Sequence, residues 1–75
     1  MTQKELLYLE DAIGHEKSIM TICNESVKLL QDESLKTFLQ GEAEKHKQAH
    51  NRLLRLMEEK ANEWSNFNWE SVINV

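Results

Sequence analysis

Residues 41–50 read GEAEKHKQAH, and they place polar side chains inside an otherwise apolar helical pattern. Residues three or four apart lie on one face of an α-helix, so His46 and His50 share a face. Leu39 and Leu53 continue that face in both directions, and a helical core would bury it. The stretch therefore predicts either a site for chemistry or a hydrogen-bonded polar layer within a small helical bundle.

The first part of the chain carries a matching apolar stripe. Apolar residues recur at alternating spacings of three and four along residues 3–30, which predicts an amphipathic helix. Thr2 and Glu5 form a capping-box pattern before it, in which each side chain accepts from the other residue's backbone amide. Glu16 is the one charged member of the stripe. The stripe consists of Leu6, Leu9, Ile13, Glu16, Met20, Cys23, Val27 and Leu30.

A short polar link follows this helix, and Asp32 is suited to cap a second helix over residues 33–62. So short a link makes the two helices antiparallel. The expected fold is all-α, with a long helical hairpin over residues 1–62. Residues 63–75 form an aromatic C-terminal tail or a short third helix, which either closes one end of a bundle or docks on another protein.

The apolar stripes are wider than two helices can cover, which predicts a homodimer in which two hairpins form a four-helix bundle. A tail of this length looks too short to cover the stripe in a monomer. The residues expected at the interface are Leu9, Ile13, Met20, Leu53, Met57, Trp64 and Trp69.

An antiparallel turn near residues 31–32 places Glu16 level with residues 47–50. A carboxylate beside two histidines can bind zinc or iron, so Glu16, His46 and His50 are candidate metal ligands, with His15 and Glu42 in support. The alternative is a structural layer, in which Glu16 is hydrogen-bonded to a histidine and fixes the register of the bundle.

Composition excludes several other classes. A single cysteine, Cys23, rules out an internal disulfide and suits a reducing compartment, and its place in the stripe makes it a core residue. A net charge of −4 argues against nucleic acid as a partner. No signal peptide or membrane span is evident, which predicts a soluble cytoplasmic protein. No nucleophile–base set or phosphate loop occurs, so we expect no enzyme.

The stretches LEDAIGHEKSI and LLQDESLKTFLQGEAEKHKQAHNRLLRLM resemble half of a ferritin-like protein, and among these the small spore coat F-like proteins. Ala12 and Glu16 match the first di-iron motif of that family, and His50 matches the histidine of its Glu-x-x-His motif. Lys47 stands where the bridging glutamate belongs, and His46 is a replacement ligand. The resemblance implies a ferritin-like bundle with a structural place in the spore coat.

Three functions follow from these observations. The first is a non-enzymatic structural or assembly protein that works as a hairpin homodimer. The second is a reduced ferritin-like protein that binds one zinc or iron ion. The third is a small adaptor that docks on a partner protein through its aromatic tail.

Overall fold

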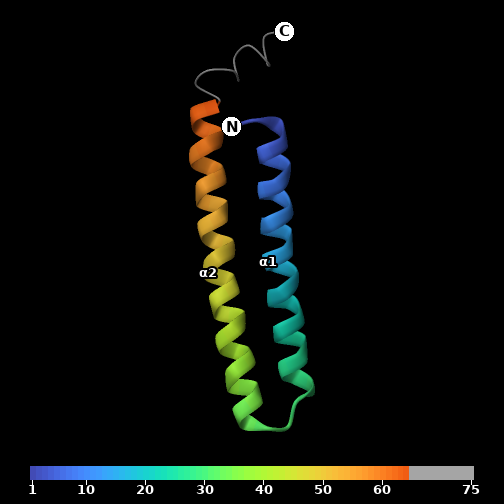
Figure 1. Ribbon diagram of the computed structural model, residues 1–75. Helices are drawn as coiled ribbons and strands as arrows, with labels where there is room; N and C mark the ends of the chain where they lie inside the picture. The colour runs from blue at the N-terminus through green and yellow to red at the C-terminus, as the bar shows by residue number, and fades with distance from the viewer. Residues whose placement is uncertain (65–75) are drawn as a thin grey trace.

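The computed structural model describes residues 1–64 of the chain, with side chains described up to Asn62. It consists of two long helices, α1 (Gln3–Leu29) and α2 (Glu33–Trp64). The helices run antiparallel, side by side, and are joined by a short turn at one end (Figure 1). The predicted all-α hairpin is thus confirmed, with helix ends within two residues of the expected ones.

Both helices begin at the caps that the sequence predicts. At the start of α1, the Glu5 backbone amide donates to the Thr2 hydroxyl over 3.0 Å, and the Thr2 amide donates to the Glu5 carboxylate over 2.7 Å. At the start of α2, the Leu35 amide donates to the Asp32 carboxylate over 3.0 Å. These side chains satisfy amides that a helix start leaves without intrahelical partners.

The two helices meet along a seam formed by the seven-residue repeat of each. The seam residues of α1 are those of the predicted stripe, and in α2 they alternate in the same way as Lys36, Leu39, Ala43, His46, His50, Leu53, Met57 and Lys60. Only Cys23 and Ala43 are buried among the described residues, each with 8% of its surface exposed. The other seam residues are half-buried, because two helices shield each other on one side only.

Neither helix, within the described part of the chain, is long and apolar enough to cross a membrane. The predicted tail, residues 63–75, begins within the last turn of α2. The remaining residues of the tail, for which a short third helix is one expectation, lie outside the described residues.

Candidate functional site

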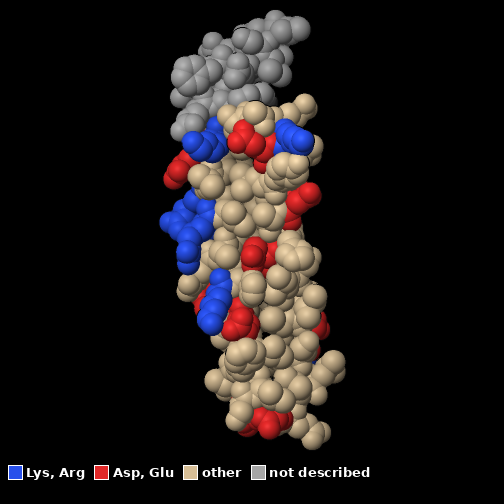
Figure 2. All heavy atoms as spheres, in the orientation of Figure 1, with Lys and Arg blue, Asp and Glu red and all other residues tan. Residues whose placement is uncertain are grey.

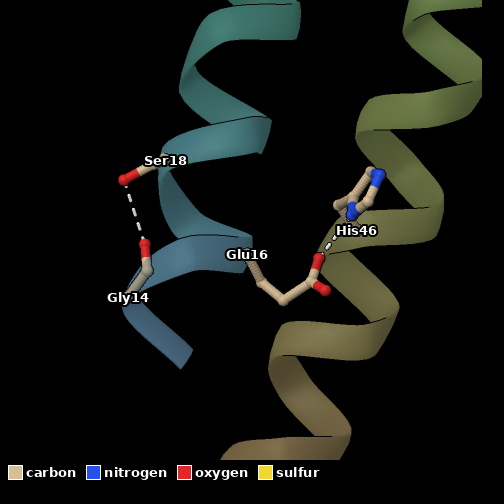
Figure 3. A network of polar contacts seen from close by, with 4 residues as sticks. All are labelled: Gly14, Glu16, Ser18 and His46. Carbon is tan, nitrogen blue, oxygen red and sulfur yellow. Dashed lines mark hydrogen bonds and ion pairs between the residues drawn. The ribbon is translucent and has the colours of Figure 1, made fainter. Parts of the chain in front are cut away.

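Glu16 and His46 meet across the seam at the middle of the hairpin (Figure 3). The Glu16 side chain reaches from α1 towards α2, where Nδ1 of His46 donates a hydrogen bond to its Oε2. The Glu16 side chain is 22% exposed and the His46 side chain is 29% exposed. Because partial burial removes water from both groups, each satisfies a polar atom that would otherwise lose its hydrogen bond. The pair is thus a side-chain hydrogen bond that joins the two helices.

The pairing register differs slightly from the prediction. Glu16 contacts His46, which lies one residue before the predicted window of residues 47–50. The difference arises because α1 ends at Leu29 and α2 begins at Glu33, so the hairpin turns about a point near residue 31. Facing residues sum to twice the number at the centre of the turn, so a centre at 31 rather than between 31 and 32 replaces residue 47 by His46 opposite Glu16.

His50 does not join the pair. In the seven-residue repeat, His46 occupies the seam column of Leu39 and Leu53, whereas His50 occupies the neighbouring column of Ala43 and Met57. The two columns border opposite sides of the seam. His50 is half-buried on its own side, so the structure brings together two of the three predicted metal ligands.

The supporting residues also lie apart from the pair. His15 is exposed, and Glu42 forms an ion pair with Lys45 over 3.2 Å. Within residues 1–62, no group of three or more histidine, cysteine, aspartate or glutamate side chains is arranged to hold a metal ion. A structural zinc site takes four protein ligands. One hairpin brings together two donors here, Glu16 and His46.

The expected interface residues fall into two groups. Five of them are half-buried in the seam, where they pack between α1 and α2 of the same chain: Leu9, Ile13, Met20, Leu53 and Met57. The other two cannot be placed in this way, because the side chain of Trp64 and all of Trp69 lie outside the described residues. The seam residues therefore contribute first to the hairpin itself.

A second set of apolar residues is much more exposed. We call it the outer apolar face, and its six members are between 43% and 85% exposed. They are Tyr8, Ile22 and Leu29 on α1, and Leu35, Phe38 and Leu56 on α2. The sequence carried a signal for this face, because Tyr8, Ile22 and Leu29 are separated by multiples of seven and so share one position of the helical repeat.

The six residues lie on one side of the hairpin. Next to the seam on that side, Ala12, Ile19 and Ala49 are half-buried, whereas Lys17 and Lys47 on the opposite flank are exposed. At the open end, a shallow groove confirms that both helices contribute to the same side. It is lined by Met1, Glu5, Tyr8, Leu9, Ala12, Leu56 and Lys60.

Figure 2 shows this side of the molecule. Below a blue and a red patch near its middle, the surface is nearly free of charged side chains down to the acidic residues at the turn. Lysine and arginine side chains lie mostly along the α2 edge. The α1 edge carries one basic side chain near the start of the helix and separate acidic side chains below it. The lower half of this side is therefore mostly uncharged surface to which both helices contribute.

Comparison with known proteins finds no match to the chain among protein-family models, curated proteins or solved structures.

Proposed function

We propose that this chain is a non-enzymatic structural or assembly protein that works by pairing with a second copy into a four-helix bundle. The observation that carries the proposal is the outer apolar face. Six large apolar side chains are substantially exposed, while only Cys23 and Ala43 are buried within the described residues. A hairpin that exposes more of its large apolar groups than it buries gains stability by covering them.

Small size supports the same proposal. A domain of 75 residues has a core that rarely contributes more than a few kcal/mol of net stability, and a lone cysteine offers no internal disulfide. Packing two hairpins about a two-fold axis doubles the buried apolar surface without any new sequence. In this proposal the Glu16–His46 pair is a structural polar layer rather than a reactive centre.

The resemblance to spore coat F-like proteins supplies a setting for the proposal. A self-pairing hairpin without catalytic groups suits a coat or another protein assembly, formed after synthesis in the cytoplasm. Lys47 favours this setting over ferritin-like redox chemistry, because an ammonium group cannot bridge two metal ions.

Sedimentation of the full chain tests the proposal. We expect a species of twice 8.8 kDa at micromolar concentration, with helicity that falls together with the dimer on dilution. A stably folded monomer of 8.8 kDa under these conditions would contradict the proposal.

Metal binding is a second candidate, and the contact between Glu16 and His46 is the observation that favours it. The test is the metal content of the purified full chain after exposure to zinc or iron(II). One ion bound per chain or per dimer, and lost on His46→Ala, would favour the metal-binding function. A His15→Ala variant, which alters an exposed histidine, is the matched control.

A further inference from the structure

We propose that two copies pair through the outer apolar face about a two-fold axis parallel to the helices, so that both turns lie at the same end of the bundle. This inference rests on the proposed homodimer and adds which face is buried and how the copies are oriented. The occupant of the face is a second copy of this chain. Three features of the described residues favour it: apolar matching, charge matching and the level of the polar pair.

The apolar residues match one another under this axis. The Glu16–His46 contact shows which residues of α1 and α2 lie at one level. Since a two-fold axis along the hairpin lays α2 of one copy over α1 of the other at equal height, three apolar pairs form across the interface. Phe38 meets Ile22 of the second copy, Leu35 meets Leu29, and Leu56 meets Tyr8. Each pair occurs twice, so all six exposed positions are covered.

The other arrangement that closes a dimer covers fewer of them. A two-fold axis perpendicular to the helices lays α2 over α2 in the reverse direction. Phe38 then meets Leu56 of the second copy, and Ile22 meets Tyr8. Leu29 is brought level with Met1, but Leu35 is brought level with Glu59. Leu35, next to the turn, would therefore lie against a charge.

Charges at the edges favour the same orientation. Within the described residues, Asp11 on α1 and Arg52 and Arg55 on α2 form no ion pair in their own chain. The parallel axis places the α2 edge of one copy beside the α1 edge of the other, and Asp11 then lies level with Arg52 of the second copy. The perpendicular axis instead brings the two Lys45 side chains together near the axis. Complementary edges select orientation more than they add affinity.

The polar pair fits this arrangement. Glu16 and His46 occupy seam columns on the side of the outer apolar face. A two-fold axis along the helices holds both copies at the same height, so the two polar pairs face each other. Polar groups then meet polar groups at the centre, and apolar groups meet apolar groups on either side.

Substitution of Phe38 tests the face. In the full chain, Phe38→Lys should raise the dimer dissociation constant by about a hundredfold, because two phenyl groups per dimer lose their burial. The matched control is Leu7→Lys, which alters a leucine that is 56% exposed on the opposite side of α1. Circular dichroism at high concentration shows whether each variant keeps its helices. Equal effects of the two variants on association would overturn the assignment of the face.

Orientation is tested by a distance between the two turns. A nitroxide is attached at Gln31→Cys in full chain that also carries Cys23→Ala, and electron paramagnetic resonance measures the separation of the labels in the dimer. Turns at one end give labels less than about 25 Å apart, whereas turns at opposite ends give about 45 Å. A dimer with the longer distance overturns the inference and leaves the proposed function standing. A monomer without dipolar coupling overturns both.

Discussion

The contact between Glu16 and His46 leads to the most detailed prediction, a double-mutant cycle across the seam. Removing one partner strips a half-buried polar group of its hydrogen bond. We expect each of Glu16→Ala and His46→Ala to lower the free energy of unfolding by about 1–3 kcal/mol. The double variant should lose less than the sum of the two, with a coupling energy of about 1 kcal/mol.

The magnitude follows from burial. Both side chains keep about a quarter of their exposed surface, so water screens them less than a surface pair and more than a fully buried one. Glu25 and Lys28 form the matched control. Their ion pair spans 3.2 Å, but the side chains are 64% and 69% exposed. Such a pair within one helix should show a coupling energy of at most about 0.5 kcal/mol.

Urea unfolding measures both cycles. Every variant is compared at one protein concentration, because the proposed self-association would make the apparent stability depend on it. A coupling energy at Glu16–His46 no larger than that of the control cycle would refute the view that this contact stabilises the hairpin. The double variant Glu16→Leu/His46→Leu tests whether the pair contributes to the free energy of unfolding or only to the register in which the helices pair. It should unfold at equal or higher urea concentration, because leucine at seam positions avoids the desolvation of a polar pair.

Three further predictions concern other parts of the chain. Hydrogen bonds from Thr2, first from its backbone amide and then from its hydroxyl, lower the pKa of Glu5 from its ordinary 4.5. The stabilisation of the helix start by these bonds is therefore present above pH 4.5 and is lost as the pH falls through the lowered pKa. Cα chemical shifts of residues 3–6 should report fraying of the helix at that pH, and the change should be smaller in Thr2→Ala. Gly14→Ala and Gly41→Ala should each raise the free energy of unfolding by about 0.5–1 kcal/mol in urea titrations, because both glycines are inside helices and an added Cβ meets nothing within 4 Å; a loss of stability would indicate a contact that one hairpin does not reveal. Deleting residues 66–75 should leave the sedimentation of the dimer unchanged, because the outer apolar face ends at Leu56, and dissociation on deletion would assign the tail to the interface.

Local signals in the sequence were sufficient for the architecture. The Thr2–Glu5 box and Asp32 act over three residues, so each cap is decided by its immediate neighbours. The helices between them follow from a seven-residue repeat that no proline interrupts. These features depend on chemistry within one or two turns, and they are the ones the structure confirms.

The pairing of Glu16 could be predicted only approximately, because it depends on a turn rather than on a repeat. Periodicity shows which residues face the seam, but the level at which they meet depends on where α1 ends. An end at Leu29 selects His46 and leaves His50 in the adjacent seam column. Helical spacing of four residues places two side chains on one face, but the Glu16 carboxylate contacts the histidine of one column of that face, His46.

The wide apolar stripe of each helix has two parts that do different work. Residues such as Leu9 and Met57 are half-buried between the helices, so their truncation should act on the hairpin in every state of association. Residues such as Ile22 and Phe38 are mostly exposed on the hairpin, so they add little to its own stability. A solitary hairpin would gain no burial from large apolar groups at the second set. Their apolar character along one side is therefore the physical reason for attributing function to the paired molecule rather than to the single chain.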